Sequence, residues 1–343
     1  MYLIVQEYSM IKIRHILFLA IIVGFSACTK DLSDDFRVYP NNPLNDTIWA
    51  RSINSNAPIH EILDSTLPHP LIDSFNANSA DTVRLPNNME LSFPANACQY
   101  ISGTPVVGKI KIEFQPLLKK GDMLRALQAT TSNNTLLELT GQFLLKLSKN
   151  GQELILAPNT FIKIKYPDTQ DNPQQYMNLF KGIESTPIPS WGKDTSFTWQ
   201  KGDIGTTIGI WYKTGAGPNN KGYEMSTKNI RWIGCGRYLD STVPKNKLTA
   251  ILPPNFTNKN TLVFAVLENT KTIIELKADY SSRSFAALNI PLNTKLNIVT
   301  ISKIGTSFYF GIRNINDIGN TAIYSISPEK KSLNYILAEL DKL

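Results

Sequence analysis

Strict alternation of apolar and polar residues in two short stretches is the feature that most constrains this fold. Residues 109–114 and 162–166 each place an apolar side chain at every second position. A strand that buries one face and leaves the other in water needs this period of two. Asn150 and Gly151 separate two further apolar runs, and because both residues tolerate a positive φ, they predict a tight hairpin. Short strands at this spacing predict a β-sandwich.

The rest of the folded chain reads as a second β-rich region with a terminal helix. At 343 residues with 42% hydrophobic content, the chain has room for about two domains with buried cores. We therefore predict a β-sandwich domain over residues 81–190, a loop-rich connection, and a second β-rich domain over residues 197–343. After Ser327 and Pro328 the apolar residues recur at helical spacing, which predicts a C-terminal α-helix. Its apolar face consists of Leu333, Ile336, Leu337 and Leu340. The predicted fold class is mainly β, with two β-sandwich-like domains and a C-terminal helix.

Residues 1–27 have the pattern of a secretory signal peptide. Lys12 and Arg14 precede an apolar run over residues 16–24, and small residues follow up to Ala27. This order predicts cleavage after Ala27, with Met10 as an alternative true start. The apolar run is too short to span a bilayer, which takes about 20 residues.

Residues 25–28, Phe-Ser-Ala-Cys, resemble the lipobox of bacterial lipoproteins. In that family the cysteine becomes the first mature residue and carries the acyl chains, so the resemblance implies lipidation at Cys28. Because Thr29 is not an inner-membrane retention aspartate, the resemblance also implies an anchor in the outer membrane, on its periplasmic or cell-surface side. Polar and turn-forming residues dominate residues 28–80, which predicts a flexible tether. In the alternative interpretation, part of this segment packs on the first domain.

Two further resemblances concern the folded part. Residues 83–97 followed by residues 107–112 look like the opening of the sandwich domain found in ankyrins and netrin receptors, with a β-hairpin, a Pro-x-x-Ala corner and an alternating strand. This resemblance implies a fold and no particular partner. Four motifs, at residues 120–123, 130–133, 136–141 and 231–238, resemble uncharacterised lipoproteins of Bacteroidetes-type bacteria. In those proteins an acidic residue often follows the cysteine of the fourth motif, where this chain has Gly236.

Positive charge gathers in one part of the sequence. The net charge is +7, and loss of residues 1–27 removes two positive charges and one negative charge, which leaves +6. Eight lysines and arginines lie between Thr195 and Ala250, against three acidic residues. Such a patch would suit an acidic glycan or lipopolysaccharide, and the alternative is a solvated basic face without a partner. No run of adjacent lysines and arginines indicates a nucleic-acid partner.

The residues needed for common catalytic chemistry are few. Of the three histidines, His15 belongs to the predicted signal peptide, and His60 and His69 belong to the predicted tether. A Ser-His or Cys-His nucleophile pair needs an imidazole held by packing, so neither domain offers one. No cluster has metal-ligand spacing, and we expect no cofactor. Cys98 and Cys235 could form one disulfide, but because they fall in different predicted domains, buried free thiols are favoured.

Aromatic residues give the one positive indication of binding. Four of the five tryptophans, Trp191, Trp199, Trp211 and Trp232, lie close together in the sequence with two tyrosines among them. Exposed aromatic rings beside polar groups can stack on sugars. We predict Trp211, Tyr212 and Tyr223 as glycan-binding residues, and in the alternative interpretation these rings fill the core.

These features predict a lipid-anchored protein of the cell envelope with a non-catalytic binding or scaffolding role. Its partner would be a glycan or another envelope protein. The alternative is an extracytoplasmic glycan-active enzyme, which needs two facing carboxylates about 5–10 Å apart. The available carboxylates are Glu90, Glu113, Glu138, Glu224, Glu268 and Glu275.

Overall fold

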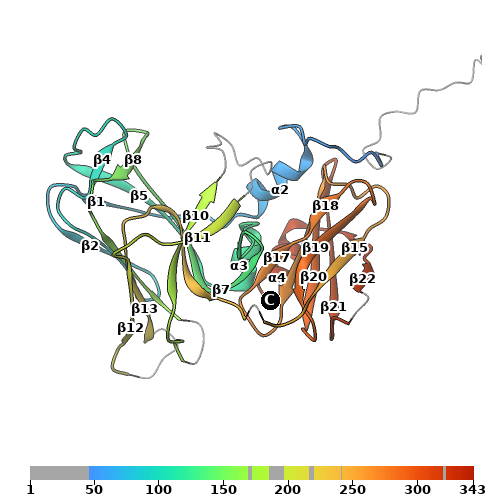
Figure 1. Ribbon diagram of the computed structural model, residues 1–343. Coiled ribbons are helices and arrows are strands. Elements are labelled where there is room, and N and C mark those ends of the chain that lie inside the picture. The colour runs from blue at the N-terminus through green and yellow to red at the C-terminus, as the bar shows by residue number, and fades with distance from the viewer. Residues whose placement is uncertain (1–45, 169–171, 185–196, 216–219, 241, 320–321) are drawn as a thin grey trace, which may run out of the picture. The chain divides into compact units, whose positions relative to one another are not determined.

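The computed structural model describes residues 46–343 apart from 169–171, 185–196, 216–219, 241 and 320–321. The predicted signal peptide, its cleavage site at Ala27 and the predicted lipidation site Cys28 lie outside the described residues, as does Trp191. The described chain is mainly β, with four sheets in which antiparallel pairing predominates and a short C-terminal helix (Figure 1). None of its described helices is long and apolar enough to cross a membrane.

A nine-stranded and a five-stranded sheet form what we call the N-terminal sheet pair. The main path of the larger sheet runs in the order β1-β5-β7-β14-β10-β11, with β4, β6 and β8 attached to it. Its strands are β1 (Leu71–Asn76), β4 (Cys98–Tyr100), β5 (Lys109–Leu117), β6 (Thr131–Ser132), β7 (Thr135–Lys149), β8 (Gln152–Leu156), β10 (Asn178–Glu184), β11 (Phe197–Lys201) and β14 (Arg231–Tyr238). The smaller sheet runs in the order β12-β13-β9-β3-β2. Its strands are β2 (Asp81–Leu85), β3 (Met89–Phe93), β9 (Ile162–Pro167), β12 (Thr207–Tyr212) and β13 (Lys221–Thr227).

The two predicted alternating stretches lie in different sheets of this pair and point into one core. Ile110, Ile112 and Phe114 on β5 are fully buried, and so are Ile164 and Tyr166 on β9. All five belong to one cluster, which we call the N-terminal core. The predicted strands are therefore confirmed. The hairpin is confirmed too, since β7 ends and β8 begins on either side of Asn150 and Gly151, which have φ values of 50° and 79°.

A four-stranded and a five-stranded sheet form the C-terminal sheet pair. The smaller sheet runs in the order β18-β19-β15-β22, and its β15–β22 pairing is parallel. Its strands are β18 (Lys277–Asp279), β19 (Ser284–Pro291), β15 (Lys245–Ile251) and β22 (Ala322–Ser325). The larger sheet runs in the order β17-β16-β20-β21-β23. Its strands are β16 (Thr261–Leu267), β17 (Ile273–Glu275), β20 (Leu296–Ile304), β21 (Ser307–Ile315) and β23 (Glu329–Lys331).

Strand β16 is buried on both faces, because two cores meet at it. Val263 and Ala265 pack with residues of the smaller sheet, whereas Leu262, Phe264 and Val266 belong to a separate cluster that we call the junction core. The junction core also contains residues of β7, β11 and β14, so it joins the two sheet pairs. Three helices contribute to it: α2 (Pro58–Thr66), α3 (Lys120–Arg125) and α4 (Leu333–Leu340).

Helix α4 confirms the predicted C-terminal helix. Ile336 and Leu340 of the predicted apolar face are fully buried in the junction core. The helix begins later than Ser327 suggested, because Ser332 caps it by accepting a hydrogen bond from the Tyr335 amide at 3.2 Å. Pro328 instead lies just before the short strand β23.

Part of the predicted tether forms a helix and a strand, α2 and β1. Helix α2 buries Ile59 and Ile62 in the junction core, and the Thr66 hydroxyl donates to the Arg125 carbonyl at 2.8 Å. Strand β1 pairs with β5 along its whole length and buries Phe75. The sequence of this segment looked polar because only one face of each element is apolar. The second interpretation, that part of the segment packs on the folded chain, matches these contacts.

The N-terminal sheet pair includes strands that lie after residue 190, where the sequence predicted the first domain to end. Strand β14 lies between β7 and β10, and β13 pairs with β9. Residues up to Tyr238 therefore complete the first two sheets rather than begin the second domain.

We expect a fragment of residues 81–190 to lack a cooperative thermal transition, because it contains neither β1 nor β12, β13 and β14. Without β14, strand β7 loses its partner over eight residue pairs. Circular dichroism melting of this fragment beside residues 46–343 tests the sheet order. A sharp transition in the short fragment would contradict it.

Candidate functional site

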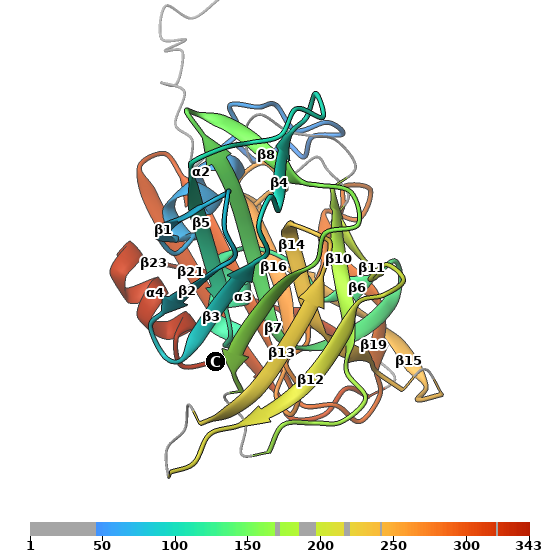
Figure 2. The same cartoon turned by 90° about the vertical axis from the view of Figure 1, so that its left-hand side faces the viewer.

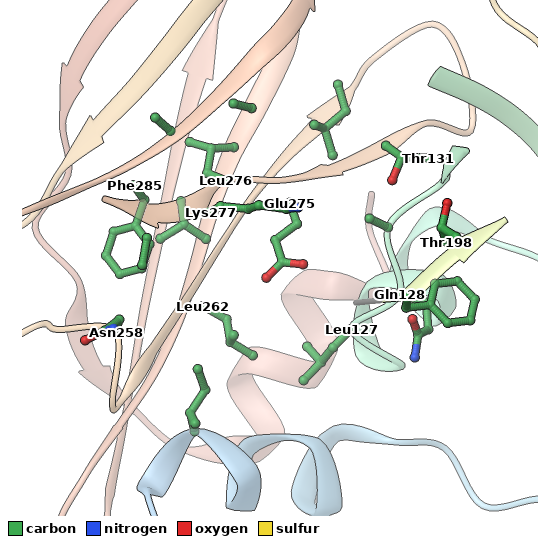
Figure 3. A pocket seen from close by; sticks show the side chains of 18 of the residues that line it. Leu127, Gln128, Thr131, Thr198, Asn258, Leu262, Glu275, Leu276, Lys277 and Phe285 are labelled. Carbon is green, nitrogen blue, oxygen red and sulfur yellow. The ribbon is translucent and has the colours of Figure 1, made fainter. Parts of the chain in front are cut away.

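A cleft of about 1490 Å³ opens between the N-terminal and C-terminal sheet pairs (Figure 3). One wall comes from the segment between α3 and β6 and from β11. The opposite wall comes from β16, β17, β18 and β19, and α2 lies along one side. The site therefore draws on segments from residue 53 to residue 289, which no local sequence pattern brings together.

Apolar side chains from four different segments line much of the cleft. Ile59 and Leu63 reach it from α2, Leu127 from the segment after α3, and Leu262 and Phe285 from the C-terminal sheets. Leu127 holds a φ of 55°, an uncommon conformation for a non-glycine residue. Walls of this kind suit the apolar body of a ligand.

A few polar groups face the same space. The Glu275 carboxylate points from β17 into the cleft, and Gln128, Thr131 and Thr198 lie across from it (Figure 3). The Thr198 hydroxyl accepts a hydrogen bond from the Asn133 amide at 2.7 Å, which fixes the position of that wall. An apolar cleft with a small number of placed polar groups is the usual form of a small-molecule site.

One arginine forms ion pairs with two carboxylates that line the cleft. The Arg231 guanidinium donates to Glu153 at 2.8 Å and to Glu184 at 3.0 Å. Burial disfavours its charge, but the two carboxylates outweigh burial and raise the Arg231 pKa. The Trp232 indole donates to the other oxygen of Glu184 at 2.9 Å. Glu153 therefore accepts from Arg231, and Glu184 accepts from both Arg231 and Trp232.

The opposite rim carries Lys245, Lys247, Lys277 and Asp279. The Asp279 carboxylate accepts hydrogen bonds from the Ser281 hydroxyl at 2.6 Å and from the Ser282 amide at 3.3 Å. Hydrogen bonds from the Ser281 and Ser282 side chains contribute most, and together with those from the two backbone amides they lower the Asp279 pKa to about 2. Asp279 thus stays ionised at neutral pH and cannot serve as a general acid.

The walls are joined where the turn between β16 and β17 meets the segment from α3 to β7. The Thr130 amide donates to the Ile273 carbonyl at 2.8 Å, and the Ile273 amide donates to the Thr130 hydroxyl at 2.9 Å. Asn289 adds a bond across the cleft, from its side-chain amide to the Asn134 carbonyl at 2.9 Å. These contacts set the distance between the two walls.

The three predicted glycan-binding residues lie on β12 and β13, away from the cleft, and the structure separates them. Tyr223 is fully buried in the N-terminal core, where its hydroxyl donates to the Gln174 carbonyl at 3.2 Å. Burial raises its pKa. The prediction that the Tyr223 ring stacks on a sugar is therefore wrong. Trp211 is half-buried, and Tyr212 is 69% exposed. Because neighbouring residues of a strand point to opposite faces, these two rings do not form one surface.

Two more tryptophans of the sequence cluster belong to the interior. Trp199 and Trp232 are both buried in the junction core. The Trp199 indole donates to the Ala129 carbonyl at 3.0 Å, so its polar group is satisfied inside the protein. For these residues the alternative interpretation, that the rings fill the core, describes the structure.

Both cysteines in the described chain are buried free thiols. Cys98 and Cys235 belong to the same N-terminal core, so the expectation that they lie in different domains is wrong, although the favoured free state is found. Burial raises the pKa of Cys98 to about 12 and that of Cys235 to about 11. Thiols of this kind are unreactive at neutral pH.

Most carboxylates considered for the enzyme alternative are paired with cations outside the cleft. Glu90 lies 3.6 Å from Lys165, Glu113 lies 2.6 Å from Lys111, and Glu224 lies 3.1 Å from Lys163. The buried Glu138 lies 2.8 Å from Arg237. Of the six, Glu275 lines the cleft. No local sequence pattern indicates Glu153, Glu184 or Gln128 as cleft residues, because contacts between distant parts of the chain bring them to the cleft. In the part of the chain that the structure describes, no group of His, Cys, Asp and Glu could hold a metal ion.

Comparison of the chain with protein-family models, curated proteins and solved structures finds no match.

Replacing Tyr223 with alanine should lower the free energy of unfolding by about 3–5 kcal/mol, because it empties a large buried volume. Replacing the adjacent Tyr212, which is exposed, should change it by no more than about 0.5 kcal/mol. Urea denaturation of both variants measures the difference. Equal losses would contradict the assignment of these rings to the interior and to the surface.

Proposed function

We propose that this chain is a lipid-anchored protein of the cell envelope that binds an amphipathic ligand between two β-sandwich-like domains and catalyses no reaction. The observation that carries the proposal is the cleft, which combines apolar walls from both sheet pairs with the inward-pointing Glu275. Such a site suits a molecule with an apolar body and a hydrogen-bond donor placed against the Glu275 carboxylate.

The charges around the cleft support binding over catalysis. A glycan-active enzyme needs one carboxyl group kept protonated and a second kept ionised within reach of one bond. Glu153 and Glu184 both bind Arg231, and Asp279 has its pKa lowered to about 2 by serine hydrogen bonds. Glu153 and Glu184 are thus committed to an ion pair with Arg231, and Asp279 does not supply the protonated carboxyl group.

The anchor rests on the sequence alone. The lipobox-like residues 25–28 and the signal pattern before them support acylation at Cys28. Several acyl chains bind a membrane far more firmly than one, so a lipidated Cys28 would hold the protein at the outer membrane without a spanning segment.

Changing Cys28 to serine should leave an unlipidated precursor that moves from the membrane fraction to the soluble fraction. Cell fractionation with immunoblotting, together with metabolic labelling by a fatty acid, measures both effects. A matched Cys98→Ser variant should keep the label and stay with the membrane. If the Cys28→Ser protein remains membrane-bound and labelled, the anchor proposal fails.

Ligand binding in the cleft can be tested with N-phenyl-1-naphthylamine, a fluorescent probe with an apolar body and one N–H donor. Ala278 lines the cleft and is exposed, so Ala278→Phe should fill the site without disturbing a core, and it should weaken probe binding by at least about tenfold. Glu275→Gln should weaken binding less, because an amide oxygen still accepts a hydrogen bond. Lys295→Phe, at an exposed position outside the cleft lining, is the matched control. Equal fluorescence from all four proteins would refute the site.

A further inference from the structure

The outer face of the five-stranded N-terminal sheet presents an ordered array of polar side chains to solvent. Figure 2 looks onto this face, with β2, β3, β13 and β12 in front. Cross-strand pairing aligns Gly209, Glu224, Lys165, Glu90 and Arg84 in one row across all five strands. A second row contains Thr207, Ser226, Lys163, Ser92 and Thr82. Neighbours in each row lie about 4.8 Å apart, the spacing of paired strands.

Trp211 adds one aromatic ring to this face. Its indole N–H donates to the carbonyls of Tyr166 and Tyr223, both at 3.2 Å, which fixes the ring against the sheet. Its cross-strand neighbour is Gly222, whose missing Cβ would lie 2.0 Å from the Tyr166 carbonyl oxygen. Only glycine fits there, so no side chain of β13 stands beside the ring. A ring held in place before binding loses little conformational entropy when a ligand stacks on it.

The charges on this face favour an anionic ligand. Lys163 pairs with Glu224 at 3.1 Å and Lys165 pairs with Glu90 at 3.6 Å, and Arg84 adds a third cation, so the two rows carry one net positive charge. The Lys165 ammonium lies 4.7 Å from the centre of the Trp211 ring, so an apolar surface and a positive charge adjoin. At the other end of the rows, Thr82, Arg84, Ser92 and Lys163 line a hollow of about 480 Å³, with Asp81 also in its lining.

We infer that this face is a second binding surface, separate from the cleft, and that it takes a polysaccharide bearing carboxylate, sulfate or phosphate groups. The Trp211 ring would stack on the C–H face of one sugar, and the adjacent Lys165 would pair with its acidic group. The hydroxyl row would exchange hydrogen bonds with sugar hydroxyls, and Arg84 and Lys163 would hold a second acidic group in the hollow. The rival explanation is that the charged row only keeps an exposed sheet face soluble.

The test is affinity electrophoresis of the full chain in gels containing alginate, a polyuronate, or laminarin, a neutral glucan. Alginate should retard the wild type, and added salt should weaken the effect because the charges are exposed to solvent. Laminarin should retard it far less. Trp211→Ala should weaken alginate binding by at least about tenfold. Tyr212→Ala, a change of the next ring on the opposite face of the same strand, should leave it unchanged.

A second pair of variants tests binding without removing a side chain that could stabilise the fold. A Cβ at Gly209 meets no atom within 4 Å, so side chains added there reach solvent without a clash. Gly209→Glu should weaken alginate binding several-fold, whereas its uncharged match Gly209→Gln should have a smaller effect. Absence of alginate binding by the wild type, equal binding of laminarin, or equal effects of Trp211→Ala and Tyr212→Ala would each overturn the inference.

Discussion

The buried ammonium group of Lys271 is the contact on which the arrangement of the two sheet pairs depends. It lies in the turn between β16 and β17 and donates to the carbonyls of Leu118 at 2.9 Å and Thr140 at 3.2 Å. The next residue, Thr272, donates its hydroxyl to the Leu137 carbonyl at 2.9 Å. Burial lowers the Lys271 pKa, and the nearby carboxylates of Asp168, Glu138 and Asp122 oppose this shift, so the contact carries a desolvation cost that its partners offset only in part. Both carbonyls that accept from the ammonium belong to the N-terminal half of the chain, so the contact ties the turn to the first sheet pair.

Strand β7 makes this docking possible by serving two cores. Leu137 and Leu139 face the junction core, whereas Phe143, Leu145 and Leu147 face the N-terminal core. The change of side coincides with an irregularity in its pairing with β14, between Cys235 and Gly236. A Cβ at Gly236 would lie 2.1 Å from the Glu138 carbonyl oxygen, so the bulge requires glycine at that position. This gives a packing reason for Gly236, where resemblance to envelope lipoproteins suggested an acidic residue.

Local patterns predicted the parts of this fold that local physics controls. The alternation in β5 and β9, the Asn150–Gly151 hairpin and the apolar face of α4 each express a short period in the sequence. The position of β14 between β7 and β10 does not, because it depends on pairing between segments about 50 to 100 residues apart. The same limit applies to the aromatic cluster. Tyr223 and Tyr212 have similar polar neighbours in sequence, yet sheet pairing buries one ring and exposes the other. The cleft was beyond prediction, since its walls combine segments from residue 53 to residue 289 that only long-range contacts bring together.

The ion pairs around the cleft bear on the choice between the proposed binding role and catalysis. Catalysis by two carboxyl groups depends on environments that separate their pKa values, usually by burial of one without a cation. Here the most buried of the carboxylates considered, Glu138, is 3% exposed, pairs with Arg237 at 2.8 Å and lies outside the cleft lining. At the rim, Arg231 holds Glu153 and Glu184 in the same way. Glu275 faces the side of the cleft that carries Gln128 and Thr131. In the proposed role its carboxylate would select a ligand by the donor that the ligand carries, and the apolar walls from both sheet pairs would supply the affinity.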